Sequence, residues 1–354
     1  IFIRDACITL FGRSSSVSQV TRLIGNASMM PWPITYDDVL AARDRIAPVL
    51  PPPPLRSYAR LDEALDMHVL VKHENHQPTN AFKVRNALTA MTTLSDDEKR
   101  RGVIAATMGN YGQGLAWAGR ELDVDVVICV PHGVNPDKID AIRGFGAELV
   151  IEGETYDDAV VVQDRLVNER GLLALHGVNH PMMPAGAGTI TLEIIEQCER
   201  LGESLDSMFI GVGGGSQAVG AMTVLRHRSP NTRVIGVQSA GASAIYDACR
   251  ANDPAIHRKP DTIAEGLATG QTYEQTFAPL RDGLADFVTV TDAELLAAMR
   301  LIMTSTHNLI EPSAAAGVAA AINLRDTQRG RTVAVILSGA NVDMRTLARI
   351  LNEL

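Results

Sequence analysis

The chain has 354 residues, 46% hydrophobic and 21% charged, which is the composition of a globular protein with one large or two smaller domains. Its 32 basic and 41 acidic residues give a net charge of −9, which argues against nucleic acid or an anionic membrane as the main partner. No apolar run reaches the ~20 residues of a membrane span. The four cysteines are scattered without a CxxC pair, which indicates reduced thiols and a cytoplasmic location: Cys7, Cys129, Cys198 and Cys249.

The first part of the chain precedes the predicted fold. We interpret residues 1–33 as an N-terminal extension, because Arg4 and Asp5 interrupt its apolar stretch and argue against a signal peptide. Residues 34–50 predict an amphipathic helix capped by Thr35 or Asp37. The proline run 51–54 ends that helix and predicts a stiff spacer.

From residue 68 onward, short apolar runs alternate with helical patterns. The predicted strands are 68–72, 102–107, 125–131, 147–153, 207–213, 232–239, 286–291 and 332–339. The predicted helices are 82–94, 112–122, 135–146, 156–170, 218–228 and 292–306. Strands that are continuously apolar are typical of mostly parallel sheets with helices on both faces, so the predicted class is α/β. In such sheets ligands bind at the carboxyl ends of the strands, where polar or glycine-rich turns are of interest.

Three glycines and a serine stand at the end of the strand predicted at 207–213 and directly after it. A helix is expected to begin at Gln217 or Ala218. The backbone N–H groups of consecutive glycines can converge on an anion, and a helix N-terminus attracts negative charge. A dinucleotide-binding motif lacks its third glycine here, and no Gly-Lys-Ser/Thr forms a Walker loop. The stretch therefore predicts a site for a phosphate monoester, with a plain tight turn as the alternative: Gly213, Gly214, Gly215 and Ser216.

Two further polar turns follow strands. The loop 107–113, with Asn110 near a helix start, suits a substrate carboxylate, although Thr107 or Asn110 could equally cap the helix. Ser338 follows the last strand, where a lone serine would usually cap a helix. Finally, Lys83 stands behind Phe82 where a polar loop becomes a helix, an unfavourable place for a solvated cation. A lysine amine shielded there could form a Schiff base with a carbonyl group.

These four elements together resemble the fold-type II pyridoxal-phosphate enzymes, in the threonine/serine dehydratase and serine racemase branch. The resemblance runs from about Ile34 to Leu354 and includes the stretches NAFKVRNAL, GNYGQ, GGGS, LSGANVD and GAGT (186–189). It implies the two-domain fold of tryptophan synthase β-like enzymes and a homodimer. The large cofactor-binding domain would comprise residues 34–100 and 181–354, and the small substrate domain residues 101–180.

The resemblance also implies roles for individual residues. Lys83 matches the lysine that forms the Schiff base with pyridoxal 5'-phosphate, and Phe82 the residue beside the pyridine ring. Asn110 matches the residue that binds the 3-hydroxyl group, and Ser338 the partner of the ring nitrogen. The phosphate loop is matched by Gly213, Gly214, Gly215 and Ser216. The residues expected at the substrate are Asn80, Ala81, Thr107, Gly109 and Tyr111.

The activity that the resemblance implies is that of an ammonia-lyase (dehydratase) on a small-molecule substrate, a β-hydroxy amino acid. Lys83 would take the Cα proton, the β-hydroxyl would leave, and the released enamine would give a 2-keto acid and ammonia. A serine at the ring nitrogen limits carbanion delocalisation, which favours elimination over transamination.

Several positions depart from the family pattern. Met108 stands where racemases carry a serine as second base, so we expect little racemase activity. Asn80 replaces a glycine, Ala81 a serine and Tyr111 a histidine, which together indicate a substrate larger or more modified than threonine or serine.

No metal site is expected. Gln238 and Ala244 replace the acidic ligands of the divalent-metal site that some relatives have. The near pairs of histidines, 73 with 76 and 176 with 180, do not match HExxH, so satisfied loop or core histidines are the better interpretation.

Three alternatives stay open at this point. One is a dehydratase for a specialised substrate, such as 3-phenylserine, 3-hydroxyaspartate or an intermediate of hydroxyectoine breakdown. Another is a β-replacement enzyme, which would need a pocket for a second nucleophile. The third is an inactive sensor subunit that retains the fold, against which the intact Lys83 argues.

Overall fold

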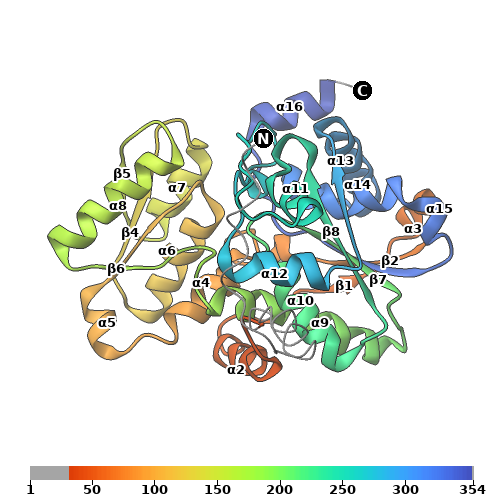
Figure 1. Ribbon diagram of the computed structural model, residues 1–354, viewed down its shortest axis with the longest axis horizontal. Coiled ribbons are helices and arrows are strands. Elements are labelled where there is room, and N and C mark those ends of the chain that lie inside the picture. Colours follow the sequence, from red (N-terminus) through yellow and green to blue (C-terminus); the bar gives the residue numbers. More distant parts are fainter. Residues whose placement is uncertain (1–31, 353–354) are drawn as a thin grey trace, which may run out of the picture. The chain divides into compact units, whose positions relative to one another are not determined.

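The computed structural model describes residues 32–352, and from Pro33 onward these form one compact unit. The N-terminal extension expected at residues 1–33 lies, up to residue 31, outside the described residues. Two sheets are present (Figure 1): a six-stranded sheet with the order β1-β2-β10-β7-β8-β9 and a four-stranded sheet with the order β5-β4-β3-β6. Within the described chain every neighbouring pair is parallel except β1 with β2, so the predicted α/β class is confirmed.

The eight predicted strands are all present. The six-stranded sheet consists of β1 (Leu55–Arg56), β2 (His68–Lys72), β7 (Ser207–Gly211), β8 (Arg233–Ser239), β9 (Asp286–Val290) and β10 (Thr332–Ile336). The four-stranded sheet consists of β3 (Val103–Ala106), β4 (Val126–Val130), β5 (Glu148–Ile151) and β6 (Leu173–Ala174). Strands β1 and β6 were not predicted, because two residues are too few to show a pattern.

The helices cover both faces of each sheet. On the six-stranded sheet, α3 (Ala59–Leu65), α13 (Asp292–Thr306) and α14 (Ala316–Asn323) share one hydrophobic core with the strands. The helices α9 (Met182–Leu201) and α10 (Ser216–Arg228) pack against each other, and α10 also packs on β7 and β8. The remaining helices of this part are α2 (Tyr36–Ile46), α11 (Ala244–Ala251), α12 (Glu274–Gly283), α15 (Arg325–Gln328) and α16 (Met344–Asn352), with 3-10 turns η1 (Glu74–His76), η2 (Ala240–Ala242), η3 (Glu265–Leu267) and η4 (Pro312–Ala315).

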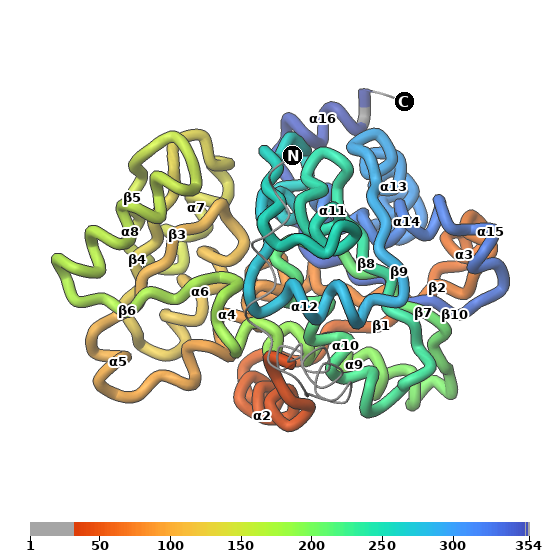
Figure 2. Tube along the Cα trace, viewed as in Figure 1, coloured from red at the N-terminus to blue at the C-terminus, as the bar shows by residue number. Residues whose placement is uncertain are grey.

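The four-stranded sheet is built from one continuous stretch of chain, together with α5 (Asp96–Arg101) to α8, as the tube in Figure 2 shows. Residues of α6 (Asn110–Leu122) and α7 (Pro136–Gly144) share a core with one face of this sheet. The other face packs on α8 (Tyr156–Arg170). Helix α4 (Lys83–Met91) belongs to the core with α6 and also packs on α9. It therefore joins the two halves of the molecule, one built on the four-stranded sheet and the other on the six-stranded sheet.

Helix α2 begins as predicted, and Thr35 rather than Asp37 is its cap. The Thr35 hydroxyl accepts a hydrogen bond from the N–H of Asp38, and the Asp38 carboxylate accepts one from the N–H of Thr35. This reciprocal pair satisfies two N–H groups that have no partner within the helix. The proline run that follows leads without regular structure into β1.

Helix α9 was not predicted, because its sequence contains Pro184, Gly186 and Gly188. Pro184 stands in the first turn of the helix, where its missing N–H would have no intrahelical partner in any case. A Cβ atom at Gly186 would lie 2.8 Å from the carbonyl oxygen of Arg85. The glycine therefore permits the close packing of α9 on α4, which explains the GAGT stretch structurally.

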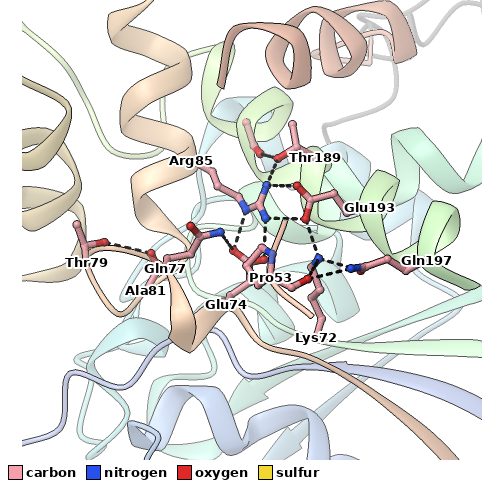
Figure 3. Close-up of polar contacts among 11 residues, drawn as sticks. Pro53, Lys72, Glu74, Gln77, Thr79, Ala81, Arg85, Thr189, Glu193 and Gln197 are labelled. Carbon is pink, nitrogen blue, oxygen red and sulfur yellow. Dashed lines mark hydrogen bonds and ion pairs between the residues drawn. The ribbon is translucent and has the colours of Figure 1, made fainter. Parts of the chain in front are cut away.

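Four charged side chains are buried together between β2, η1, α4 and α9 (Figure 3): Lys72, Glu74, Arg85 and Glu193. Arg85 donates to the two oxygens of Glu74 at 2.7 and 2.9 Å and to those of Glu193 at 2.7 and 2.8 Å. Its remaining N–H bonds the Thr189 hydroxyl at 3.0 Å, so all five guanidinium N–H groups have acceptors. Lys72 donates to Glu193 at 2.7 Å, and two cations thus balance two carboxylates.

The network lowers the pKa of the Glu193 carboxyl. Burial by itself would raise this pKa, but the charges of Arg85 and Lys72 outweigh burial and hold it below its ordinary value of 4.5. A carboxyl whose pKa is lower in the folded than in the unfolded chain stabilises the fold fully above pH 4.5. That contribution is lost as the pH falls through the pKa of the folded state.

We expect Glu193→Gln to lower the free energy of unfolding at pH 7 by ~3–5 kcal/mol, because two buried cations would then share one carboxylate. Denaturant unfolding followed by circular dichroism measures the difference from wild type. This difference should shrink as the pH falls from 4.5 through the lower pKa of the folded state, because Glu193 protonates first in the unfolded chain and then in the folded wild type.

The matched control for this experiment is Glu196→Gln on the same helix. Glu196 is partly exposed and pairs with Arg43 at 3.2 Å, a type of ion pair that contributes less than ~1 kcal/mol. If Glu193→Gln lowers the free energy of unfolding by no more than the control does, the stabilising role of the network is contradicted.

Candidate active site

A cavity of about 720 Å³ lies at the carboxyl ends of strands from both sheets. The segments after β2, β3, β7 and β10 all contribute to its lining, as expected for parallel sheets. The predicted site residues that line it are Phe82, Lys83, Thr107, Gly109, Asn110, Tyr111, Gly213, Gly214, Gly215, Ser216 and Ser338. The fold therefore brings the four predicted elements together around one space.

Asn80 and Ala81, expected at the substrate, are not among the described residues that line the cavity. Ala81 is fully buried and pairs with Gly339 in an isolated antiparallel bridge. Asn80 has a φ of 53°, and its carbonyl accepts a hydrogen bond from Ala340 at 2.8 Å. Asparagine tolerates this left-handed conformation better than most residues, which explains why it can stand where the family resemblance implies a glycine. Both residues connect the segment before Lys83 to the turn at Ser338. Because neither lines the cavity, the structure does not support the predicted contact of Asn80 and Ala81 with substrate.

Lys83 is the first residue of α4 and is half-buried in the cavity wall. Its Nζ lies 5.0 Å from the centroid of the Phe82 ring. Burial lowers the pKa of Lys83 to about 8, against the opposing effect of the Glu311 carboxylate. An unprotonated amine, the form that acts as nucleophile or base, is therefore accessible near neutral pH.

The glycine loop lies between β7 and α10. A Cβ atom at Gly213 would lie 2.2 Å from the carbonyl oxygen of Gly266, and one at Gly214 would lie 2.5 Å from Val178. Gly215 has a φ of +91°, which side chains rarely adopt. The helix begins at Ser216, one or two residues earlier than predicted, and the N–H groups of its first turn have no intrahelical acceptor. Only glycines fit this loop, and its shape and polarity fit a phosphate group.

Asn110 is the first residue of α6, two residues before the start of the helix predicted at 112–122. Its Nδ2 donates to both oxygens of Glu311, at 2.8 and 3.0 Å, and its Oδ1 accepts from Asn341 at 2.9 Å. The side chain is thus oriented into the cavity and does not cap the helix, whose N-cap is Gly109 with a φ of 151°. Asn110 connects the loop after β3 with residues of the six-stranded sheet.

Glu311 and Lys138 are cavity residues that were not predicted. Burial raises the pKa of Glu311, although the neighbouring Lys138 and Asn110 act against this rise. Lys138 forms an ion pair with Glu265, and its carboxylate neighbours Glu311 and Glu265 outweigh burial and raise its pKa. Glu311 is the one charge in the apolar stretch 309–322, a signal that could have marked it as buried. Lys138 stands in an ordinary amphipathic helix and gives no such signal.

The other predicted site residues in the cavity wall differ in their hydrogen bonds and exposure. The Thr107 hydroxyl accepts from the N–H of Gly109 at 3.1 Å, which closes the loop on itself. The Tyr111 hydroxyl donates to the carbonyl of Leu175 at 3.3 Å and is therefore already used. Met108 lines the cavity and is 43% exposed. Ser338 lines it too; its hydroxyl bonds no other described residue, and no helix follows for it to cap before Met344.

Within the described chain, no group of three or more His, Cys, Asp or Glu residues could hold a metal ion. Gln238, in the position where the resemblance implies an acidic metal ligand in some relatives, is buried, and its side-chain oxygen accepts a hydrogen bond from the N–H of Tyr246 at 2.9 Å. Among the helices of residues 32–352, none is both long and apolar enough to span a bilayer.

Comparison with known proteins bears on this cavity. Residues 46–339 match the family model described as pyridoxal-phosphate dependent enzyme. Because the match covers most of the chain, the protein belongs to this family. Its cofactor is pyridoxal 5'-phosphate, which the glycine loop and the shielded lysine fit. The predicted resemblance to the threonine/serine dehydratase branch is confirmed by its relatives.

The chain is 34% identical to a biosynthetic L-threonine dehydratase of Escherichia coli, over 83% of the chain and 57% of that protein, so it spans little more than half of that relative. It is 32% identical to an L-threo-3-hydroxyaspartate ammonia-lyase of Saccharomyces cerevisiae, over 90% of the chain and 96% of that protein. The solved structure of a threonine deaminase from T.th. superimposes with a TM-score of 0.83 at 33% identity, covering 88% of this chain and 99% of that one.

We expect Gly213→Ala to weaken binding of pyridoxal 5'-phosphate by at least about tenfold, or ~1.4 kcal/mol, since its Cβ would meet the backbone of Gly266. Titration of cofactor-free protein, followed by absorbance, gives the dissociation constant. Gly144→Ala is the control, because the added Cβ would meet no described atom within 4 Å apart from its chain neighbours and the backbone of its own helix. Equal affinity in Gly213→Ala and the control would exclude this loop as the phosphate site.

Proposed function

We propose that this pyridoxal-phosphate dependent enzyme is an ammonia-lyase that removes water from a β-hydroxy amino acid to give a 2-keto acid and ammonia. The observation that carries the proposal is that Lys83, Asn110, the Gly213–Ser216 loop and Ser338 line one cavity. The relatives support it, since those named above are a threonine dehydratase, a threonine deaminase and a hydroxyaspartate ammonia-lyase.

Each of these cavity residues has a proposed role in cofactor binding. Lys83 would bond the aldehyde carbon as a Schiff base, with Phe82 beside the ring, and the loop 213–216 would hold the phosphate. Asn110 would donate to the 3-hydroxyl oxygen, and Ser338 would bond the ring nitrogen with its available hydroxyl. When bound, the cofactor supplies the electron sink that makes the Cα proton of the substrate acidic.

The residues of the chain then account for the proton transfers. The Lys83 amine, with a pKa of about 8, accepts the proton from Cα. The Cβ–O bond then breaks with its electron pair on oxygen, and the departing hydroxide takes up one proton, the equivalent of the one removed from Cα, and leaves as water. The released enamine tautomerises to an imine, and one water hydrolyses it to the 2-keto acid and ammonia. The net change is loss of ammonia alone, since one water leaves and one is consumed.

We also propose a division of roles between the two parts of the chain. The six-stranded sheet part (34–100 and 181–354) would be the cofactor domain, because it carries the phosphate loop and Ser338. The part 101–180 would be the substrate domain. Racemisation should be slow, because the thioether of Met108 cannot transfer a proton. Serine dehydration, the homodimer and the cytoplasmic location stay predictions.

We expect purified wild-type protein with cofactor to show a visible imine absorption band, and Lys83→Ala to lose both this band and all keto acid production. Lys99→Ala serves as the control, since Lys99 lies on α5 and is not one of the described residues that line the cavity. Keto acid and ammonia are measured with L-threonine, L-serine and bulkier 3-hydroxy amino acids. A Lys83→Ala variant that still eliminates water would disprove the assignment of this residue.

The pKa of Lys83 has its own measurable consequence. Only the neutral amine attacks an aldehyde, so the rate at which cofactor-free protein binds pyridoxal 5'-phosphate covalently should rise with pH and level off above about pH 8. Stopped-flow absorbance between pH 6 and 10 gives the midpoint. A midpoint at 10 or above, the value of a solvated lysine, would contradict the effect of burial.

A further inference from the structure

Besides His257, three ring side chains that none of these roles uses line the cavity: Tyr156, His176 and Tyr273. We call them the ring cluster. Tyr156 opens α8 and His176 follows β6, both beside the four-stranded sheet, whereas Tyr273 precedes α12 beside the six-stranded sheet. The rings of His176 and Tyr273 meet edge to face, with their centroids 6.1 Å apart. The ring cluster is therefore formed by both halves of the molecule.

Each member of the ring cluster presents a neutral polar group. Two backbone N–H groups, of Val178 and Asn179, donate to the Nδ1 of His176 at 3.0 and 2.9 Å. Nδ1 is thus unprotonated, so Nε2 carries the proton, and burial keeps the pKa of His176 below 6.5. The hydroxyls of Tyr156 and Tyr273 bond no other described residue, and burial raises the pKa of Tyr273 to about 12. Three hydrogen-bond donors are therefore available without a charge.

The charges around the ring cluster disfavour an anion. Among the cations of the cavity, Lys138 is paired with Glu265, and Arg258 is paired with Asp247 at 3.0 Å. Lys259 and His257 are exposed to solvent, and the carboxylate of Asp157 stands next to Tyr156 in the lining. A carboxylate placed at the cluster would face the carboxylate of Asp157 and gain no unpaired buried cation to offset its partial loss of hydration. An uncharged acceptor of hydrogen bonds avoids this cost.

The size of the cavity leaves room for such a group. Its volume of about 720 Å³ lies in the upper part of the range of ~300–1,000 Å³ for small-molecule sites. The methyl substituent on Cβ of threonine cannot accept a hydrogen bond, so it would leave the three donors of the ring cluster unused.

We propose that the ring cluster binds an uncharged hydrogen-bonding group of the carboxamide class on the Cβ substituent of the substrate. This inference rests on the proposed elimination reaction and specifies which β-hydroxy amino acids the enzyme prefers. Tyr156, His176 and Tyr273 are then specificity residues, because they contact the substituent and not the reacting atoms.

The test compares substrates of matched shape with the wild-type holoenzyme. L-3-hydroxyasparagine and L-3-hydroxyleucine have equal numbers of heavy atoms and differ in polarity, L-3-hydroxyaspartate adds a charge, and L-3-hydroxyglutamine is one methylene longer. Keto acid formation gives kcat/KM for each. We expect at least a tenfold higher kcat/KM for one of the two carboxamides than for 3-hydroxyleucine and 3-hydroxyaspartate.

Variants then test the residues. In Tyr156→Phe and Tyr273→Phe the ratio of kcat/KM between the better carboxamide and 3-hydroxyleucine should fall several-fold, mainly through KM. This ratio is measured within one preparation, so a difference in folded fraction cancels. Tyr246→Phe is the matched control: Tyr246 packs against Phe287 at 5.5 Å and is not one of the described residues that line the cavity.

The possible outcomes separate the two proposals. If 3-hydroxyleucine or threonine is turned over as well as both carboxamides, the ring cluster does not select an uncharged polar group, while the elimination reaction stands. A preference for 3-hydroxyaspartate would overturn the inference in favour of an anionic substituent. A ratio that is unchanged in both tyrosine variants would overturn the assignment of these residues. If no substrate of either panel yields keto acid, the proposed function itself fails.

Discussion

The buried guanidinium of Arg85 fixes the part of the molecule on which the site depends. Arg85 lies two residues after Lys83 in α4, and its five N–H groups are all bonded to residues of η1 and α9. Any rotation or sliding of α4 would break these bonds and leave charges buried without partners, which costs several kcal/mol. The helix therefore has one position, and the backbone that carries the Lys83 amine has one position with it.

Close contacts between helices extend this constraint to the other functional segments. A Cβ at Gly114 of α6 would lie 3.0 Å from the carbonyl oxygen of Lys83, so α6, which begins at Asn110, packs directly on the first turn of α4. On its other side α4 packs on α9, and α9 packs on α10, which begins at Ser216. In addition, Asn86 of α4 donates to the Ser216 hydroxyl at 3.4 Å. The amine, the amide and the phosphate loop are thus positioned by one set of packed helices.

The sequence predicts those features that local patterns encode. Apolar runs marked the longer strands, and the polar turns that follow them marked Lys83, Asn110, the glycine loop and Ser338. Features that depend on distant partners were not predictable: α9 contains residues that disfavour helices, and only its packing on Arg85 explains Gly186. The ring cluster and the Lys138–Glu265 pair likewise consist of unremarkable residues from separate segments, which only the fold brings to one cavity.

The hydrogen bonds of Asn110 to Glu311 and Asn341 have a consequence for the stability of the protein. They connect the loop after β3 to the six-stranded sheet at the cavity, so a molecule bound there contacts both halves at once. A ligand that binds only the folded chain adds its binding free energy to stability, ~2.7 kcal/mol at a concentration one hundred times its dissociation constant. The free energy of unfolding of this enzyme therefore rises with the concentration of its cofactor, in addition to the fraction of the enzyme that is active.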